Sequence, residues 1–530
     1  MNNLIASPGR SHQEWANERA FAAIRSNGRV VTWGDPQYGG NSGAVANRLT
    51  RVTQIFSTGG SFAALKEDGS VVTWGKPNSG GNSSAVANQL TGVTQIFSTR
   101  YAFAALKVDG SVVTWGQSNP GGNSSDVANQ LTNITQIFST EQAFAALKGD
   151  RTVVVWGNSD YGGNAGLANQ LTNVTQVFST RYAFAALKVD GSVVTWGNPQ
   201  YGGNSIDANV TGQITTGVRQ IFATEGAFAA LRVDRTVVTW GDSQYGGNTN
   251  PITDVRQIFA TERAFAARKG NGTVVTWGDI NYGGNSSSVA SQLTNVTQIF
   301  SNDRAFAAVR EDGLVVTWGD INYGGNSSSV ASQLTNVREI FSTGSAFAAL
   351  RADGSVITWG DPESGGNSSD VSDLLTDVWK IFSTGSAFAA LRADGSVVTW
   401  GDPESGGNSS DVSDLLQLEV VAIATPFSDD ILVDTIPPTV TIISIGGVDS
   451  RVSGVDGDNT VVGTAEPGSS NVTISFGSTE LGTAPVDGNG NFTYSLTPAN
   501  ITTIGQGTGK NITATQTDTA GNIGTSPAFT

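Results

Sequence analysis

A unit of about 41 residues returns ten times along this chain, and no other feature limits the possible folds so strongly. The dipeptide Trp-Gly marks each copy, with successive spacings of 41, 41, 41, 40, 44, 37, 41, 41 and 41 residues. A Phe stands twelve residues before each of these Trp residues. A period of this length indicates supersecondary units that stack on one another, so we expect a repeat architecture over residues 11–425. The marking residues are Trp33, Trp74, Trp115, Trp156, Trp196, Trp240, Trp277, Trp318, Trp359 and Trp400.

Three short runs within one unit have the character of β-strands. They are visible in "TQIFSTRYAFAALKVDGSVVTWG", residues 94–116. The run "AFAALK" is apolar on both faces, because Phe103 and Ala105 alternate with Ala104 and Leu106, and this predicts a strand buried on both sides. The Asp-Gly pair after it suits a hairpin turn, and "VANQL" predicts an edge strand or a helical turn. The unit therefore predicts an all-β fold, in which three or four antiparallel strands form one blade of a β-propeller.

Ten blades are more than the roughly four to eight of most propellers, so the closure of the array stays open at this point. One wide ring, two smaller rings and an open spiral all fit the repeat. The period slips only over residues 198–254, between the fifth and sixth units, which hints at a division into five and five. The Phe and Trp columns are predicted to be core in each arrangement, because they stand inside the periodic apolar strands.

The stretch "ALKVDGSVVTWG" followed by a Gly-rich loop resembles the repeat of the regulator of chromosome condensation family. The resemblance covers all ten units and implies a β-propeller. Two features depart from the family. Its usual Gly-x-x-His before the apolar strand is missing, and its Gly-Gln-Leu-Gly loop is replaced by Tyr-Gly-Gly-Asn, as at residues 161–164. The nucleotide-exchange activity of the founding members is therefore not carried over.

A second domain is predicted over residues 434–530, after an N-terminal extension (1–10), the repeats (11–425) and a linker (426–433). Alternating runs broken by turn residues predict a seven-stranded sandwich. The string "GTAEPGSSNVTI" with "DGNGNFTYSL" and "ATQTDTAGN" resembles the bacterial immunoglobulin-like repeats of surface adhesins. That resemblance implies a cell-surface protein and calcium at Asp434 and Asp518, with Asp456 and Asp458 as further candidates. The alternative is that these Asp residues only form turns.

Composition excludes several classes of function. The net charge of −16 with no basic run disfavours nucleic acid as a partner. The absence of Cys removes disulfides, thiolate chemistry and Cys-ligated zinc. The N-terminus shows no cleavable signal peptide, and no apolar run is long enough to span a membrane. The chain is therefore cytosolic, exported by another route, or a piece of a larger multidomain chain.

Residues for catalysis are few. His12 is the only His, at the irregular start of the repeats, and a surface or capping role fits it better than catalysis. The Gly-Gly-Asn loops lack the Gly-Lys-Ser/Thr of a phosphate-binding loop. An Asp follows Trp-Gly in six units, as at Asp35 and Asp402, and we expect these carboxylates to form a solvated acidic rim. We predict that the chain is not an enzyme and requires no cofactor, with calcium as the one candidate.

One pair of residues differs between copies that otherwise agree. It stands directly before the doubly buried strand and would lie on one rim of a propeller. Arg and Tyr, which dominate binding hot spots, occur there repeatedly, although exposed turns also vary without function. Nearly exact copies at 344–375 and 385–416 indicate recent duplication, which a recognition surface tolerates better than a catalytic site does. The predicted ligand-binding residues are Glu18, Arg19, Arg100, Tyr101, Glu141, Gln142, Arg181, Tyr182, Glu225, Glu262, Arg263, Asp303 and Arg304.

These observations favour an extracellular or cell-surface recognition protein that binds a protein or glycan through the variable turns. The leading alternative is an intracellular, cytoplasmic propeller scaffold that acts as an exchange factor or inhibitor. An enzyme with carboxylates in the central channel, such as a glycan lyase, is disfavoured because no acid–base pair is placed for it.

Overall fold

A computed structural model gives the structure of two compact units, formed by residues 6–428 and by residues 429–530 together with 1–5. It describes residues 17–25, 27–164, 166, 170–204, 212–416, 420–423, 440–445, 459–465, 471–477, 479–487, 491–504, 511–517 and 523–526. The predicted linker, 426–433, lies outside the described residues, as do His12 and the four candidate calcium ligands Asp434, Asp456, Asp458 and Asp518. The domain boundaries therefore stay predictions at the level of single residues.

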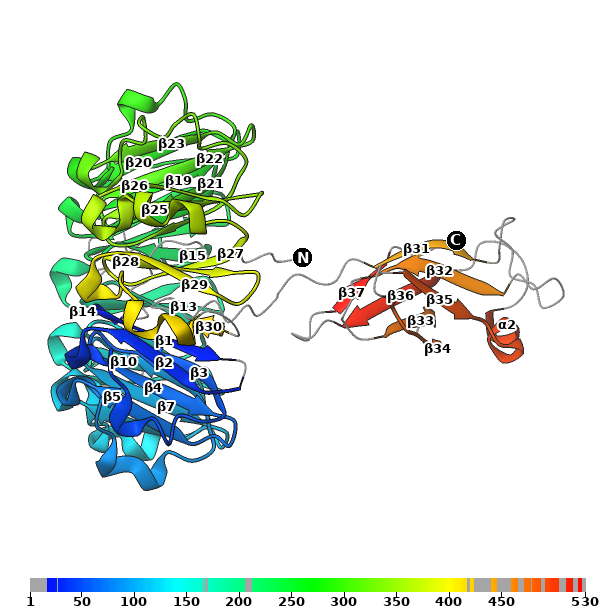
Figure 1. Ribbon diagram of the computed structural model, residues 1–530, viewed down its shortest axis with the longest axis horizontal. Coiled ribbons are helices and arrows are strands. Elements are labelled where there is room, and N and C mark those ends of the chain that lie inside the picture. Colours follow the sequence, from blue (N-terminus) through cyan, green and yellow to red (C-terminus); the bar gives the residue numbers. More distant parts are fainter. Residues whose placement is uncertain are drawn as a thin grey trace. The chain divides into compact units, whose positions relative to one another are not determined.

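The larger unit consists of ten three-stranded antiparallel sheets, each built from an entry strand, a central strand and an outer strand (Figure 1). We number the sheets 1 to 10 in chain order. The entry strands of sheets 2 to 10 are β3 (Val52–Ser57), β6 (Val93–Ser98), β9 (Ile134–Ser139), β12 (Val174–Ser179), β15 (Val218–Ala223), β18 (Val255–Ala260), β21 (Val296–Ser301), β24 (Val337–Ser342) and β27 (Val378–Ser383). The central strands are β1 (Ala20–Arg25), β4 (Ser61–Lys66), β7 (Ala102–Lys107), β10 (Ala143–Lys148), β13 (Ala183–Lys188), β16 (Ala227–Arg232), β19 (Ala264–Lys269), β22 (Ala305–Arg310), β25 (Ala346–Arg351) and β28 (Ala387–Arg392). The outer strands are β2 (Val30–Gly34), β5 (Val71–Gly75), β8 (Val112–Gly116), β11 (Val153–Gly157), β14 (Val193–Gly197), β17 (Val237–Gly241), β20 (Val274–Gly278), β23 (Val315–Gly319), β26 (Val356–Gly360) and β29 (Val397–Gly401).

The central strands are buried on both faces, as their sequence predicts. In β7, Phe103 and Ala105 pack against sheet 2, whereas Ala104 and Leu106 pack against sheet 4. Phe103, Ala104 and Ala105 are fully buried. The small Ala side chains allow neighbouring sheets to approach closely, while the Phe and Leu fill the space at either end of each interface. The same pattern makes ten apolar clusters, one between every two successive sheets.

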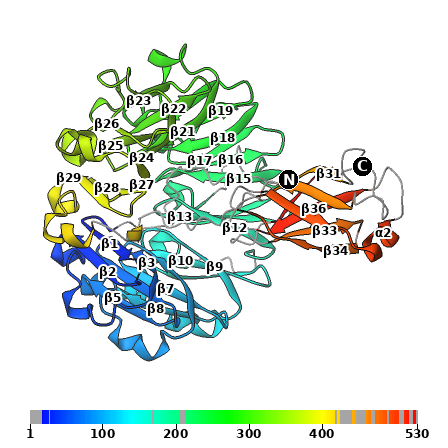
Figure 2. The same ribbon diagram turned by 45° about the vertical axis from the view of Figure 1, so that its right-hand side comes forward.

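The sheets form a single closed ring. The last strand of the unit, β30 (Val420–Ile423), pairs with β1 and so takes the entry-strand place in sheet 1. Trp33 of sheet 1 donates a hydrogen bond from its indole Nε1 to the Gly406 carbonyl oxygen of sheet 10, over 3.0 Å. Figures 1 and 2 show the yellow strands of sheet 10 beside the blue strands of sheet 1. Of the three arrangements that the sequence left open, the structure has the single wide ring, and the slip near residue 200 does not divide it.

The Tyr-Gly-Gly-Asn loops connect each sheet to the next one through a hydrogen bond and close packing. Trp74 donates from its indole Nε1 to the carbonyl oxygen of Gly39 in the preceding unit, at 3.0 Å, and stacks on Phe62 with a centroid distance of 5.2 Å. Gly39 has a φ of 97° and lies so close to the ring that a Cβ would stand 2.7 Å from Cδ2 of Phe62. Only Gly fits this conformation and this approach.

Short helical turns follow each outer strand. The turns beside the Gly-Gly pair are η1 (Pro36–Tyr38), η3 (Pro77–Ser79), η5 (Ser118–Gly122), η7 (Ser159–Tyr161), η8 (Pro199–Tyr201), η9 (Ser243–Tyr245), η10 (Ile280–Tyr282), η12 (Ile321–Tyr323), η13 (Pro362–Gly366) and η15 (Pro403–Ser405). Those near the "VANQL" position are η2 (Gly43–Val45), η4 (Ser84–Gln89), η6 (Ser125–Gln130), η11 (Ser287–Val289), η14 (Ser369–Leu374) and η16 (Ser410–Leu415). The helical-turn alternative is the one observed.

The smaller unit is a sandwich of two antiparallel sheets, in the strand orders β31-β32-β35 and β34-β33-β36-β37. The predicted seven strands are present among its described residues. Buried side chains of both sheets, including Val461, Ile474 and Phe492, form one apolar cluster. The elements are β31 (Thr441–Ile445), β32 (Thr460–Thr464), β33 (Val472–Phe476), β34 (Thr479–Ala484), β35 (Asn491–Ser495), α2 (Pro498–Ile504), β36 (Ile512–Thr517) and β37 (Ile523–Thr525).

Candidate binding rim

The variable pairs of the sequence are the turns between entry and central strands, and they gather at one end of the ring. We call these ten pairs the entry turns and this end the entry rim. The first residue of each turn joins the next turn through a backbone N–H···O=C hydrogen bond of 2.8 to 3.2 Å, and nine such bonds run from Glu18 round to Gly385. The entry turns are therefore held on a rigid circle rather than on loose loops. The linked residues are Glu18, Gly59, Arg100, Glu141, Arg181, Glu225, Glu262, Asp303, Gly344 and Gly385.

Glu141 is the centre of an ion-pair network on this circle. Its carboxylate accepts from Nη1 of Arg100 at 3.0 Å and from Nε and Nη2 of Arg181, both at 2.8 Å. Arg100 also reaches Glu18 at 2.7 Å, and Arg181 reaches Glu225 at 3.3 Å. The Glu141 side chain is only 3% exposed. Five alternating charges are thus joined across sheets 1 to 6.

The pKa of Glu141 reflects this environment. Burial raises it, but the hydrogen bond and charge of Arg181, with those of Arg100, outweigh burial, and the net shift is downward. Glu141 therefore remains ionised and is committed to holding Arg100 and Arg181. The ligand contact that the sequence predicts for Glu141 stays a prediction; in this structure the buried carboxylate supports the rim by holding the two Arg side chains.

Gly59 permits one link of this network. A Cβ at Gly59 would stand 3.0 Å from Oε1 of Glu18 and 3.1 Å from Cγ of Arg100. The bare Gly lets Arg100 pass over the turn of sheet 2 and meet the carboxylate of sheet 1. Packing therefore explains why this variable position holds Gly, and random sequence variation alone does not.

The second residues of the entry turns alternate with the Tyr residues that precede Gly-Gly, and together they form a stack. Tyr182 lies between Tyr161 and Tyr201, with centroid distances of 5.1 and 4.5 Å. The stack then passes to Tyr245, whose ring is 5.9 Å from that of Tyr201 in an edge arrangement. Further along, Arg263 lies 4.8 Å from the Tyr245 centroid. We call this set the planar stack; its members are Tyr161, Tyr182, Tyr201, Tyr245, Arg263, Tyr282, Arg304 and Tyr323.

Two Arg residues continue the alternation by cation–π contacts. Arg263 stands between Tyr245 and Tyr282, at 4.8 and 4.9 Å from their centroids. Arg304 stands between Tyr282 and Tyr323, at 4.7 and 4.6 Å. Each guanidinium is therefore held between two rings, which fixes a side chain that would otherwise be mobile.

Gly226 explains why the stack has no side chain at the step between Tyr201 and Tyr245. A Cβ there would lie 2.8 Å from Cδ1 of Tyr201 and 2.8 Å from Cγ of Tyr245. The two rings close over the Gly backbone and make contact directly. The planar stack is therefore continuous from sheet 4 to sheet 8.

Four Tyr hydroxyls of the planar stack stay protonated at neutral pH. Burial raises the pKa of Tyr161 to about 12, and burial likewise raises the pKa of Tyr182, Tyr245 and Tyr282. A protonated phenol can donate a hydrogen bond, and an Arg guanidinium donates only. Because the ring faces are largely covered by their neighbours in the stack, what remains for a ligand are ring edges and hydrogen-bond donors.

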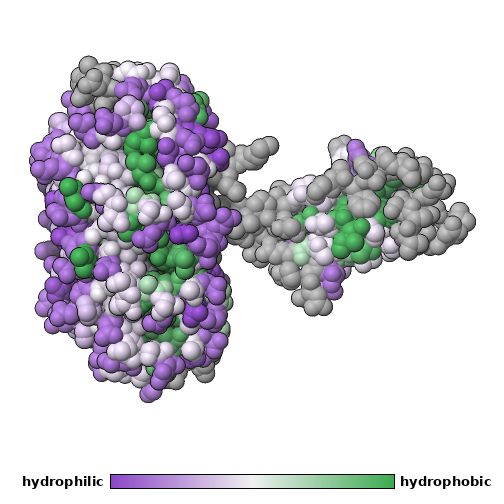
Figure 3. Space-filling view, turned by 90° about the horizontal axis from the view of Figure 1, so that it is seen from above, coloured by the Kyte–Doolittle hydropathy of each residue, from purple (hydrophilic) through white to green (hydrophobic). Residues whose placement is uncertain are grey.

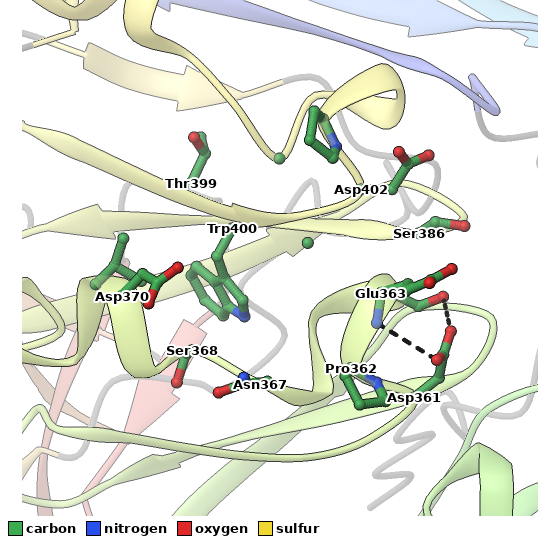
Figure 4. Close-up of a pocket in the computed structure, with 15 residues that line it drawn as sticks. Asp361, Pro362, Glu363, Asn367, Ser368, Asp370, Ser386, Thr399, Trp400 and Asp402 are labelled. Carbon is green, nitrogen blue, oxygen red and sulfur yellow. Dashed lines mark hydrogen bonds between the residues drawn. The ribbon is translucent and has the colours of Figure 1, made fainter.

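The rest of the rim has a different chemistry. Between sheets 9 and 10, where Ser364 and Ser405 replace the loop Tyr, a polar cleft of about 500 Å³ opens (Figure 4). Its lining includes Asp361, Glu363, Asp370 and Asp402, beside the buried Trp400. The entry rim therefore has an acidic cleft with small residues between sheets 9 and 10, in contrast to the aromatic and Arg-rich row of sheets 4 to 8.

The Asp residues that follow Trp-Gly act as caps. Asp361 accepts hydrogen bonds from the backbone N–H of Glu363 and from the hydroxyl of Ser364, shown as dashed lines in Figure 4. Asn158 caps in the same way at one of the positions that break the Asp series. The predicted acidic rim is thus first a set of turn caps, as expected from the local hydrogen bonding of Asp and Asn.

The predicted binding residues all lie on the entry rim, but in different roles. Arg100, Arg181 and Glu225 belong with Glu141 to the ion-pair network, and Arg19 is exposed near Glu404, at 3.9 Å. Tyr182, Arg263 and Arg304 belong to the planar stack, whereas Arg100 stands over Tyr101 at 5.6 Å. Gln142 accepts from the side chain of Asn158. The same rim carries Glu18, Glu262 and Asp303.

Sequence reasoning missed five of the eight members of the planar stack, all of them loop Tyr residues. The position before Gly-Gly holds Tyr in sheets 1 and 4 to 8 and Ser or Pro in the others. This is the same kind of variation between copies that marked the entry turns, and it could have been found in the same way.

Two further observations limit the chemistry of the described residues. They contain no group of three or more His, Cys, Asp or Glu side chains placed to hold a metal ion. Nor does the described part of the chain contain a helix that is long and apolar enough to cross a membrane. Figure 3 shows a largely hydrophilic propeller surface, on which hydrophobic residues gather in a narrow broken band.

Residues 450–530 match the family model described as bacterial Ig domain, as predicted for this part of the chain. The chain has no match among curated proteins. Several solved structures are similar at low identity. The CRINKLY WD40 ectodomain of the receptor kinase ACR4 from Arabidopsis thaliana is 15% identical, with a TM-score of 0.30, over 49% of this chain and 90% of that chain.

Two further solved structures show a likeness of the same kind. Prp20p from Saccharomyces cerevisiae is 16% identical, with a TM-score of 0.32, over 58% of this chain and 83% of its own. Human WBSCR16 is 18% identical, with a TM-score of 0.28, over 58% and 90%. These TM-scores are low, so the propeller assignment rests on the closed ring of ten sheets. The chain thus joins a ten-sheet propeller to a bacterial Ig domain.

Proposed function

We propose that this chain is a non-catalytic recognition protein of the cell surface or extracellular space, and that it binds a protein or glycan through the planar stack of the entry rim. The observation that carries the proposal is the stack itself. Rings and guanidinium groups from five successive sheets lie in one half-buried row, where other sheets of the same ring place Ser, Pro or Gly.

The stack has the properties of a preorganised binding surface. Tyr and Arg give large contact areas and specific hydrogen bonds, and both are enriched at binding hot spots. Their side chains are fixed by one another, and their backbone is fixed by the hydrogen-bonded circle of entry turns. Little conformational entropy is then lost when a ligand binds.

The Ig match supports the location. The match covers most of the smaller unit, and the same segment resembles the immunoglobulin-like repeats of bacterial surface adhesins. Calcium at Asp434, Asp456, Asp458 and Asp518 stays a prediction, because these residues lie outside the described ones.

The test compares two triple variants of the full chain. One carries Tyr201→Ser, Tyr245→Ser and Tyr282→Ser, since Ser occupies the same loop position in sheets 2, 9 and 10. The control carries Val108→Ser, Val189→Ser and Val233→Ser, at exposed hairpin positions of the opposite rim. Both are offered to intact cells and to a glycan array beside the unchanged chain, with folding checked by thermal melting.

We expect the unchanged chain and the Val control to retain the same ligand and the Tyr variant to lose it. Retention of that ligand by a folded Tyr variant would refute the assignment of the planar stack.

A further inference from the structure

The hairpin turns lie at the opposite end of each central strand, and we call that end the hairpin rim. On the hairpin rim, sheet 7 differs from the other nine sheets in one side chain of its central strand. Arg268 occupies the fifth position of its central strand, β19, and is partly exposed. Every other central strand has a buried aliphatic side chain at this position, no more than 7% exposed. These are Ile24, Leu65, Leu106, Leu147, Leu187, Leu231, Val309, Leu350 and Leu391.

The place of Arg268 is an apolar interface. Leu231, its equivalent in sheet 6, packs in the cluster between sheets 6 and 7 together with Val237. In the next interface Val274 replaces Val237 and is only partly buried, as are its equivalents Val30, Val112, Val315 and Val397 in other sheets. The side chain of Arg268 starts from this apolar interface, and its Nε is buried without a hydrogen-bond partner among the described residues, as are those of Arg232 and Arg310 at the next position of their strands.

Arg256 lies directly beside Arg268. It takes the bulged second position of β18, next to Gln257, which is the cross-strand partner of Arg268. In sheet 8 the residue at this position, Thr297, donates from Oγ1 to the carbonyl oxygen of the fifth-position residue Val309, at 3.0 Å. By the same geometry, the first atoms of the Arg256 side chain lie beside the backbone of Arg268. Burial, and after it the charge of Arg256, lowers the pKa of the Arg268 guanidinium.

Eight sheets carry an Asp in the hairpin turn, whereas sheets 1 and 7 carry Asn there, and the carboxylate that lies against the sheet 7 hairpin is that of Asp254, beside Gly270. In sheet 8, Arg310 meets the hairpin residue Asp312 at 2.9 Å. In sheet 7 the hairpin residue is Asn271, so Lys269 has no such carboxylate. In sheet 6, Arg232 forms an ion pair with Asp234 at 3.8 Å. Arg235 forms an ion pair with Asp254 at 3.6 Å.

Sheets 6 and 7 contain four further cationic side chains, those of Arg219, Arg256, Arg268 and Lys269. Arg219 holds the second position of β15, the entry strand that contacts β18. Within the part of the chain that the structure describes, no ion pair is formed by Arg219, Arg256, Arg268 or Lys269. We call these four residues of sheets 6 and 7 the basic patch; Arg256 and Arg268 are the two whose charges interact directly, on a chain of net charge −16.

We propose that the basic patch binds an oxyanion, the phosphate or sulfate group of a ligand. Guanidinium groups bind such oxygens through paired, charge-assisted hydrogen bonds. Uncompensated charge at the edge of an apolar interface is unfavourable for folding, and a bound anion offsets the repulsion between Arg256 and Arg268. The site lies on the rim opposite the planar stack and does not depend on the proposed function.

The test uses the full chain at low ionic strength, with calorimetric titration of two probes. Inorganic pyrophosphate represents phosphate, and a heparin hexasaccharide represents sulfate. Arg268→Leu restores the side chain of the sibling sheets and is expected to fold. Arg338→Thr is the matched control, because it removes one Arg from the second position of sheet 9 and restores the Thr of five other sheets.

We expect at least one probe to bind, at least tenfold more weakly to Arg268→Leu and less than twofold more weakly to Arg338→Thr. The tighter probe identifies the class of anion. Without ligand, Arg268→Leu is expected to melt at a higher temperature than the unchanged chain. Absence of binding by both probes, or equal weakening by the two variants, would overturn the proposal, since the second result means attraction by net charge alone.

Discussion

Glu141 offers a direct test of how the entry rim is held together. Replacing it by Gln keeps the shape and one acceptor oxygen but removes the charge between two guanidinium groups. Removing one partner of a fully buried ion pair costs about 3–5 kcal/mol. Arg100 and Arg181 are 30% and 28% exposed, and each keeps a second carboxylate, in Glu18 and Glu225. We therefore expect Glu141→Gln to lower the free energy of unfolding by about 2 kcal/mol at pH 7.

The effect should depend on pH in one direction. The pKa of Glu141 in the folded chain is below the 4.5 of an unperturbed Glu. Its carboxylate thus contributes stability that is fully present above pH 4.5 and is lost as the pH falls through the folded pKa. The difference between the unchanged chain and Glu141→Gln should be largest at pH 7 and should shrink below pH 4.

The assay is urea unfolding followed by Trp fluorescence at pH 7 and at pH 3.5. Glu67→Gln, at an exposed hairpin position, is the matched control, for which we expect a change within about 0.5 kcal/mol. The reasoning is refuted if Glu141→Gln changes the free energy of unfolding no more than the control does, or if its full effect persists at pH 3.5.

Three other perturbations test separate parts of the structure. Gly39→Ala should destabilise the chain by about 1–3 kcal/mol in urea unfolding, because it forces a φ of 97° and a clash with Phe62. Ile423 lies in the strand that closes the ring, so Ile423→Ala should lower the free energy of unfolding by about 2–4 kcal/mol. It should also speed the hydrogen exchange of the β1 amides, and unchanged exchange would argue against closure by this strand. Hydrogen bonds from the side chain of Ser70, and after it from the Ser70 backbone, lower the pKa of Asp68 to about 2. An NMR titration should therefore find a pKa of about 2 for Asp68 in the unchanged chain and a higher pKa in Ser70→Ala.

The repeat architecture could be predicted because local rules repeat ten times without conflict. The alternation of Phe103 and Ala105 with Ala104 and Leu106 predicted burial on both faces, and each face packs against a different neighbouring sheet. Ring closure could not be predicted in this way. It depends on pairing between Ala23 and Ile423, residues 400 positions apart, and on the small rotation between sheets, which no single unit reveals.

The candidate site was predicted in position but not in its internal contacts. Variation between copies placed the entry turns on one rim, yet the roles of individual side chains depend on residues from adjacent units. Glu141 is buried because Arg100 and Arg181 approach it from both sides, one unit before and one unit after. Gly226 is bare because two Tyr rings meet over it. Contacts of this kind arise only when the units are stacked.

The planar stack also shows how duplication of a unit can extend a row of stacked side chains without disturbing the fold. Residues 277–296 and 318–337 are identical, and they place Tyr282 and Tyr323 at the same position of two successive sheets. Because the second residue of each entry turn lies between two loop Tyr residues, one added unit adds one Arg and one Tyr in alternation. The near-copies at 344–375 and 385–416 carry Gly-Ser turns and Ser in place of Tyr, so they enlarge the ring but end the stack. The number of units therefore sets the size of the ring, whereas the entry turn and the loop residue of each unit decide how far the planar stack runs around it.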